Sequence, residues 1–264
     1  MNRPIALFDS GVGGLTVLKS VMELLPCENY LYFADNGYFP YGTKSYADLR
    51  LRLAKLLNFM ENFTPKVVVI ACNTASLHVE YLQNLTNIPI IDVIKPTCKH
   101  VESVTMNKKV CLLATDATVQ SQKYQQILQK VGVDVVAVPC SDFVPIAESG
   151  VCDTTALDII SSKLQPISHI DFDTVILGCT HFGLIKRQIC NVLGSRNYVQ
   201  CGNPTANALF DVLQNSNLLS NATKGGLNIF TTGKTESAIK VCKQLSLRLS
   251  AFQRCKFDII VLFC

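Results

Sequence analysis

Several features that would point to a particular location or partner are missing from this 264-residue sequence. No apolar stretch approaches the roughly 18 residues that a membrane-spanning helix needs. No block of Lys and Arg stands out and the formal net charge is only +4, which argues against nucleic acid as a primary partner. The beginning, MNRPIALFDSG, becomes polar too early for a secretory signal peptide. We therefore expect a soluble, cytoplasmic protein without a membrane partner.

Paired cysteine motifs are also missing, although the chain has 12 cysteines. There is no C-x-x-C pair and no repeated spacing, so neither a disulfide framework nor a zinc site is indicated. Several cysteines, such as Cys111, Cys190 and Cys242, fall in strand or helix patterns, where a free thiol packs as a small hydrophobic group. We expect free thiols and no metal.

The chain does contain an alternation of apolar, strand-like runs with amphipathic, helix-like segments. The pattern predicts strands over residues 4–9, 29–35, 66–73, 88–94, 108–115, 133–140, 174–179 and 227–233. It predicts helices over residues 15–25, 45–63, 74–85, 119–132, 156–164, from about 182, and over 208–214 and 236–249, with Ser45 as an N-cap. Continuous apolar strands separated by helices are typical of parallel sheets that are covered on both faces, so the predicted fold class is α/β.

The strand and helix pattern restarts after residue 104, which indicates two consecutive α/β halves. We predict two pseudo-symmetric domains with mainly parallel sheets. Residues 1–96 together with 206–264 would form one domain, and residues 97–205 the other. Ligands of open α/β sheets bind beyond the carboxyl ends of the strands. Asp9, Asp35, Cys72 and Cys179 all fall at such ends, so we expect the active site in a cleft between the domains.

Cys72 and Cys179 end two similar apolar strands, in VVVIACNTAS and TVILGCTHFG. A single cysteine in such a place is most simply a buried hydrophobic residue. Two thiols on opposite walls of one cleft instead indicate proton chemistry, in which one thiolate removes a proton from a carbon and the other thiol delivers one to the opposite face. Both cysteines are expected at helix N-termini, which would lower their thiol pKa values.

Polar residues beside the thiols are candidates for binding a substrate. Asp9 and Ser10 open the turn DSGVGG, where they either cap a helix or pair with a substrate ammonium group. The turn fits neither of the glycine-rich phosphate-binding patterns. Asn73, Thr74 and the pair Thr180–His181 place hydrogen-bond donors beside the two cysteines, which suits a carboxylate ligand. His181 could also tune Cys179.

Five segments resemble the aspartate/glutamate racemase family, and within it the glutamate racemases. In chain order they are FDSGVGGLTV, FPYGTKS, ACNTAS, LATDATVQSQKY and LGCTHF. The resemblance implies a cofactor-independent isomerase that converts L-glutamate to D-glutamate for peptidoglycan synthesis, with Cys72 and Cys179 as the acid/base pair. It also implies substrate contacts from Asp9, Ser10, Tyr41, Gly42, Asn73, Thr74, Thr180 and His181, supporting acid/base roles for Asp9, Glu148 and His181, and a homodimer as one expectation for assembly.

Three single residues and one short segment depart from the family pattern. Asn36 stands where Ser or Thr is usual, Lys95 where Glu is common, and Gly183 where Pro is usual. The sequence QCG at residues 200–202 stands where an Asp-Ser-Gly type of sequence is common. None of these changes removes a predicted catalytic residue.

Three other functions are compatible with parts of the pattern. An aspartate racemase would keep both thiols and take a different substrate. A binding or regulatory protein would keep the fold with only vestigial activity, but the intact thiol pair argues against it. A single-cysteine acyl-transfer enzyme would use one thiol as nucleophile and His181 as its base, which leaves the second thiol unexplained.

Overall fold

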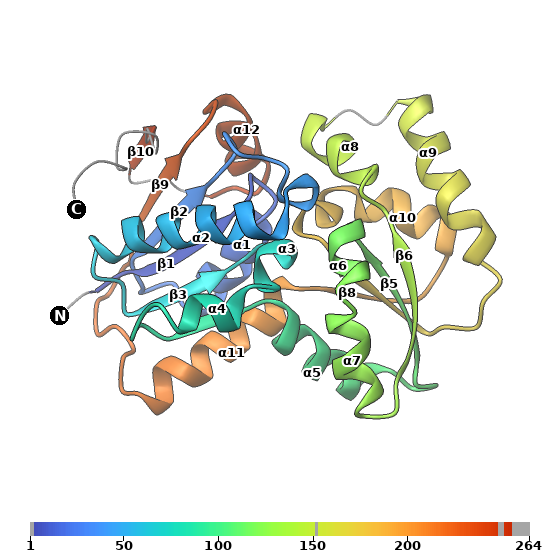
Figure 1. Ribbon diagram of the computed structural model, residues 1–264, viewed down its shortest axis with the longest axis horizontal. Coiled ribbons are helices and arrows are strands. Elements are labelled where there is room, and N and C mark those ends of the chain that lie inside the picture. The colour runs from blue at the N-terminus through green and yellow to red at the C-terminus, as the bar shows by residue number, and fades with distance from the viewer. Residues whose placement is uncertain (1–2, 151–152, 248–250, 255–264) are drawn as a thin grey trace.

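The computed structural model describes residues 3–150, 153–247 and 251–254, and it places the strands of this part of the chain in two parallel sheets (Figure 1). The first sheet has, in spatial order, β10 (Ala251–Arg254), β9 (Leu227–Thr231), β2 (Tyr30–Ala34), β1 (Ile5–Asp9), β3 (Val67–Ile70) and β4 (Ile90–Asp92). The second has β6 (Asp134–Pro139), β5 (Lys109–Ala114), β7 (Thr174–Gly178) and β8 (Asn197–Gln200). The predicted α/β class with parallel sheets is confirmed.

The two sheets repeat one topology. Strands β2, β1, β3 and β4 lie side by side in the same order as β6, β5, β7 and β8, and all neighbours are parallel. Strand β3 is therefore the counterpart of β7. Because Cys72 follows β3 and Cys179 follows β7, the two cysteines occupy equivalent places in the two halves.

Helices cover both faces of the first sheet, because alternate residues of each strand point to opposite faces. Ile5 and Leu7 of β1 belong to a core shared with three helices, whereas Ala6 and Phe8 belong to the core on the other face. The first core packs against α1 (Leu15–Leu24), α11 (Gly202–Asn215) and α12 (Glu236–Gln244). The second packs against α2 (Tyr46–Glu61), α3 (Asn73–Ser76) and α4 (Val79–Gln83).

The second sheet is covered in the same way. One core packs against α8 (Phe143–Ser149), α9 (Thr154–Leu164) and α10 (Lys186–Leu193), and the opposite core against α5 (Ile94–Val104) and α7 (Lys123–Gln129). Helix α6 (Asp116–Gln120) follows β5, and three short 3₁₀ helices complete the described elements: η1 (Tyr41–Thr43), η2 (Gln165–Ile167) and η3 (Thr180–Ile185). The predicted cleft thus lies between two covered sheets.

Two of the predicted helices are interrupted. The segment 74–85 forms α3 and α4, and the segment 119–132 forms α6 and α7. The second break falls at Gln122, whose φ of 60° is incompatible with a continuous α-helix. Ser45 caps α2 as predicted, since its hydroxyl accepts the Asp48 N–H at 3.1 Å. The predicted final residues of the last helix, 248 and 249, lie outside the described residues.

Helix α5 was not among the elements predicted from the sequence. Its buried residues Ile94, Thr97, Cys98 and Val101 follow a helical spacing, but Thr97 breaks the apolar pattern. The short elements β8, α8 and β10 were also missed. The proposed borders of the two domains, at residues 96/97 and 205/206, fall inside α5 and α11, so the division remains a prediction at that level of detail.

A buried ion pair lies at the amino-terminal ends of the strands of the first sheet, opposite the ends that lead to the cavity. Lys66 precedes β3 and Glu28 precedes β2, and their side chains are only 5% and 2% exposed. Lys66 Nζ also donates to the Leu218 carbonyl at 2.6 Å, and Glu28 accepts the Ser220 N–H at 2.7 Å. The pair therefore attaches the segment after α11 to the sheet.

We expect the substitution Lys66→Met to lower the free energy of unfolding by about 3–5 kcal/mol, because it leaves the Glu28 carboxylate buried without its partner. Urea denaturation would measure the change. Lys19→Met is the matched control, since Lys19 forms an exposed pair with Glu23 and should cost less than about 1 kcal/mol. Equal losses in the two variants would contradict the assignment.

Candidate active site

The segments that follow six strands surround one cavity of about 290 Å³. They follow β1, β2 and β3 in the first sheet and β5, β6 and β7 in the second. Strands β1 and β3, like β5 and β7, flank the point where the strand order reverses, which is the usual ligand position in open α/β folds. The residues that line the cavity are Ser10, Phe39, Pro40, Tyr41, Gly42, Thr43, Cys72, Asn73, Thr74, Thr115, Ser141, Val144, Pro145, Cys179, Thr180 and His181.

Cys72 lies on the wall formed by the first half. It caps the short helix α3, where its sulfur accepts the Ala75 N–H at 3.5 Å, and its thiol lies 3.8 Å from the Ser10 hydroxyl. Burial raises the pKa of the Cys72 thiol well above its ordinary value, and the nearby Asp9 carboxylate raises it further. The predicted lowering of this pKa by a helix N-terminus is therefore wrong. One N–H of a four-residue helix does not offset desolvation and a neighbouring negative charge.

Cys179 lies on the opposite wall and has a different neighbour. It precedes the 3₁₀ helix η3 rather than an α-helix, and its sulfur lies 3.9 Å from His181 Nδ1. The other ring nitrogen, Nε2, lies 2.8 Å from Glu148 Oε2. Burial alone would lower the His181 pKa, but the hydrogen bonds to Cys179 and Glu148 outweigh it and raise this pKa from 6.5 to about 10. The raised pKa favours the imidazolium form of His181.

Asp9 lies behind the cavity wall rather than on it. Its side chain is completely buried, and Oδ2 accepts the Gly14 N–H at 2.8 Å. Oδ1 has no hydrogen-bond partner among the described residues, which makes Asp9 an unusually available buried carboxylate. Of the eight predicted substrate contacts it is the one absent from the cavity lining. Its influence reaches the cavity through Cys72.

The glycines of DSGVGG allow the first turn to pack closely against the second half. A Cβ atom at Gly13 would come within 2.6 Å of His181 Nδ1 and of Thr180 Oγ1, and one at Gly14 within 2.6 Å of the Asp9 Cβ. A side chain at Gly13 would push the two walls apart, and one at Gly14 would disturb the packing within the first half. The turn therefore serves close packing around the site.

The other predicted binding residues do meet at the cavity. Ser10, Tyr41, Gly42, Asn73, Thr74, Thr180 and His181 line it. Tyr41 is held from behind, because its hydroxyl donates to Asp35 Oδ2 at 2.8 Å and Asp35 also accepts two hydrogen bonds from Arg52. Glu148 does not line the cavity and acts on it through His181.

The sequence analysis missed several lining residues, among them Thr115 and Ser141. Thr115 follows β5, which is the counterpart of β1, and its hydroxyl lies 3.1 Å from that of Thr74. The rule that found Asp9 at the end of β1 could have found Thr115. Ser141 and Val144 lie around the start of α8, which sequence patterns did not predict.

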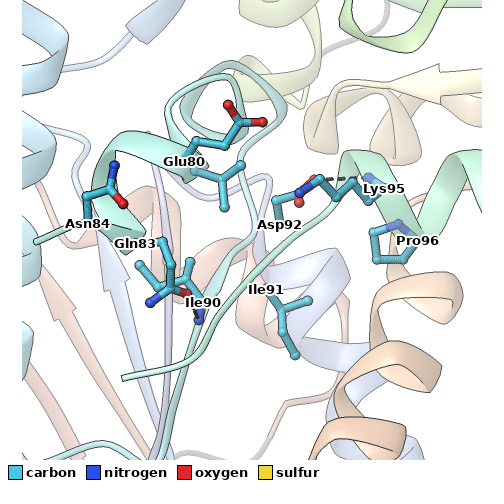
Figure 2. Close-up of a pocket in the computed structure, with 9 residues that line it drawn as sticks. Glu80, Gln83, Asn84, Ile90, Ile91, Asp92, Lys95 and Pro96 are labelled. Atoms are coloured by element: carbon cyan, nitrogen blue, oxygen red, sulfur yellow. Dashed lines mark hydrogen bonds between the residues drawn. The ribbon is translucent and has the colours of Figure 1, made fainter. Parts of the chain in front are cut away.

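The four departures from the family pattern lie outside this cavity. Lys95 lines a separate cavity of about 430 Å³, where its backbone N–H donates to Asp92 Oδ1 at 3.0 Å (Figure 2). Asn36 binds the loop after β9 through Thr231 and Gly233. Gly183 and Gln200 are neighbours, since a Cβ at position 183 would come within 2.6 Å of the Gln200 amide oxygen.

No group of three or more His, Cys, Asp or Glu side chains within the described residues is arranged to hold a metal ion. In the same part of the chain, none of the helices combines the length and the apolar character needed to cross a membrane.

A cavity between two repeated α/β halves, with one thiol on each wall, is suited to an enzyme that handles a proton on two faces of one carbon. The chain belongs to the Asp/Glu/Hydantoin racemase family, whose model matches residues 16–201. It is 34% identical over 249 residues to a glutamate racemase of Thermoanaerobacter sp. (strain X514), covering 92% of this chain and 93% of that one.

Solved structures of glutamate racemases have the same fold. Isoform RacE1 of Bacillus anthracis superposes with a TM-score of 0.89 at 31% identity, covering 94% of this chain and 96% of that one. The Francisella tularensis enzyme, solved in complex with D-glutamate, has a TM-score of 0.89 at 30% identity and covers 97% and 98%. The similarity extends over both sheets.

We expect Glu148→Gln to lower the His181 pKa from about 10 toward its ordinary value of 6.5, because it removes the charge that stabilises the imidazolium. Titration of the imidazole resonances by NMR would measure it. Since the pKa is raised in the folded state, the stabilisation from this pair is complete below about pH 6.5 and is lost as the pH rises through about 10.

The difference in unfolding free energy between the wild type and Glu148→Gln should accordingly be larger near pH 6.5 than near pH 10. Glu23→Gln is the control, because Glu23 lies in an exposed pair remote in sequence from the site and should leave the His181 titration unchanged. An unaltered His181 pKa in Glu148→Gln would contradict the role of Glu148.

Proposed function

We propose that this protein interconverts L- and D-glutamate with Cys72 and Cys179 as its acid and base. The observation that carries the proposal is the pair of thiols at equivalent strand ends on the walls of one cavity. A racemase must remove a proton from one face of the α-carbon and return one to the other. Similar proteins named glutamate racemase, matched along most of their length, support glutamate as the substrate.

In the proposed reaction one cysteine acts as a thiolate and takes the α-proton, while the other, as a thiol, donates its proton to the opposite face of the carbanion. The substrate neither gains nor loses atoms, and the two cysteines exchange protonation states. The reverse reaction uses them in exchanged roles. Positioned general acid and base groups each contribute about 10²- to 10⁴-fold to the rate.

The two thiols would be assisted by different groups. The buried Asp9 carboxylate near Cys72 is a candidate for taking the proton from that thiol, because its Oδ1 has no hydrogen-bond partner in the described part of the chain. On the other side, the His181 imidazolium, held by Glu148, would stabilise negative charge on the Cys179 sulfur. Asp9 also remains our candidate for attracting the substrate ammonium group.

The substrate carboxylates would be bound by neutral donors. None of the described lining residues is Lys or Arg, whereas Ser10, Thr74, Thr115 and Thr180 supply hydroxyl groups and Asn73 an amide. A cavity of about 290 Å³ is adequate for a small amino acid.

We further propose that the reaction needs no cofactor and supplies D-glutamate for peptidoglycan in the cytoplasm, as the family resemblance implies. A homodimer remains a prediction. The partner that matters for catalysis is the small-molecule substrate.

We expect the purified protein to racemise both enantiomers of glutamate without added pyridoxal phosphate or metal, and to be unaffected by a chelator. In deuterated water the product must carry deuterium at the α-carbon, which circular dichroism combined with mass spectrometry would detect. An acyl-transfer enzyme or a binding protein would not introduce this label. Preferential turnover of aspartate, or a requirement for pyridoxal phosphate, would contradict the proposal.

We expect Cys72→Ser and Cys179→Ser each to abolish racemisation in both directions, because the hydroxyl is a far weaker acid than the thiol and turnover needs both groups. Elimination of chloride from a β-chloro analogue of glutamate needs only the base. Each variant should therefore retain elimination from one enantiomer, with opposite preferences in the two variants. By resemblance, Cys72 would act on the D-enantiomer and Cys179 on the L-enantiomer.

Chiral chromatography of the remaining analogue would measure both preferences, with the wild type as the reference for elimination from both enantiomers. The reverse handedness would correct only the assignment of each base to an enantiomer. Loss of the same enantiomer in both variants would rule out the two-base mechanism.

A further inference from the structure

The side-chain amide of Asn73 is held by two buried residues that the proposed reaction does not use. The Tyr124 hydroxyl donates to Asn73 Oδ1 at 2.6 Å. The amide nitrogen of Asn73 lies 3.6 Å from Cys201 Sγ, and this sulfur lies 3.8 Å from the Tyr124 hydroxyl. The three side chains form a closed triangle, and Asn73 is the member that lines the cavity.

The triangle brings together three distant parts of the chain. Asn73 begins α3 in the first half, Tyr124 lies on α7 in the second half, and Cys201 joins β8 to α11. Tyr124 is completely buried, and Asn73 and Cys201 are 2% and 3% exposed. Cys201 belongs to one of the segments that depart from the family pattern. Its thiol lies where a buried polar partner for Asn73 is needed.

The amide has one favoured orientation within this triangle. Burial raises the pKa of the Tyr124 phenol, so its hydroxyl keeps its proton, and a carbonyl oxygen is a much better acceptor for it than sulfur. Cys201 Sγ also lies 3.6 Å from the Leu177 carbonyl, which can accept its S–H and leave a sulfur lone pair for the Asn73 N–H. Cys201 Sγ lies 3.7 Å from Asn73 Oδ1, almost the same distance as from the amide nitrogen. The Tyr124 hydroxyl is therefore the contact that decides the orientation, with Oδ1 at Tyr124.

An amide nitrogen carries two hydrogens, and the contact with Cys201 uses one of them. The second hydrogen is then available to an acceptor in the cavity. With the reversed orientation, Asn73 would present its oxygen, which repels a carboxylate but accepts a hydrogen bond from a carboxamide. The orientation of this one side chain therefore bears on which ligand the cavity prefers.

We propose that Tyr124 and Cys201 are positioning residues, which fix the Asn73 amide so that it donates to a substrate carboxylate and discriminates against the corresponding amide. The proposal rests on the proposed function, since it assumes glutamate as the ligand. It adds to that function two residues that determine specificity without contacting the substrate.

The test compares wild type with Tyr124→Phe and Cys201→Ala. For glutamate we expect KM to rise about tenfold with kcat changed much less, as for the loss of a buried hydrogen bond that serves binding. Glutamine and isoglutamine, which are the two mono-amides of glutamate, serve as competitive inhibitors. For at least one of them, the ratio of its inhibition constant to the KM for glutamate should be lower in both variants than in wild type.

Three further variants separate positioning from general loosening of the core. Cys98→Ala removes another buried thiol, one that lies on α5 outside the triangle, and should leave KM and the inhibitor preference unchanged. Cys201→Ser should restore the preference that Cys201→Ala loses, because a hydroxyl can still accept from Asn73 and donate to Leu177. Cys201→Val fills the space of the thiol with apolar groups and should behave like Cys201→Ala.

Thermal unfolding would establish which variants are folded. If Cys201→Ala does not fold, Cys201→Val takes its place in the test. The positioning role alone would be overturned if the wild type racemises glutamate but the folded variants keep its KM and its inhibitor preference. The variants in question are Tyr124→Phe, Cys201→Ala and Cys201→Val. Wild type that does not racemise glutamate would overturn the proposed function, and the positioning role with it. An equal change of KM and of inhibitor preference in Cys98→Ala would also overturn the positioning role.

Discussion

The site depends on the direction of two strands. Strands β3 and β7 hold the same place in two parallel sheets of the same order, and each delivers a cysteine at its carboxyl end. The two sheets present these ends to one cavity, so the thiols stand on its two walls. A reaction at two faces of one carbon needs such an arrangement. The glycine turn between β1 and α1 lets the walls approach, because a side chain at Gly13 would collide with Thr180 and His181.

The symmetry of the backbone does not extend to the charges. Cys72 lies near a buried carboxylate and keeps a raised pKa, whereas Cys179 lies near the His181 imidazole, whose own raised pKa favours its charged form and which Glu148 holds. The immediate neighbours of the two thiols therefore differ although the two halves share a topology. A racemase transfers protons in both directions between enantiomers that are equal in energy, so it needs both thiols to change protonation state. The unlike neighbours offer each thiol its own means of doing so.

Buried polar contacts behind the cavity fix the groups that would touch the substrate. Asp35 holds Tyr41 and is itself held by Arg52, and Tyr124 with Cys201 holds the amide of Asn73. Each network is largely buried, where hydrogen bonds are strong and unpaired groups are costly. Such contacts restrict the lining side chains to one orientation before a ligand arrives, which reduces the entropy lost on binding.

The sequence by itself determined the α/β class, the repeated halves and the candidate residues at the strand ends, because periodicity and strand-end position are local signals. It also indicated both cysteines, since each follows an apolar run directly. Only the tertiary structure decided that Asp9 is buried behind Cys72, that the Cys72 pKa is raised rather than lowered, and that Thr115 lines the cavity. These properties arise from contacts between segments far apart in the chain, where desolvation and neighbouring charges outweigh local propensity.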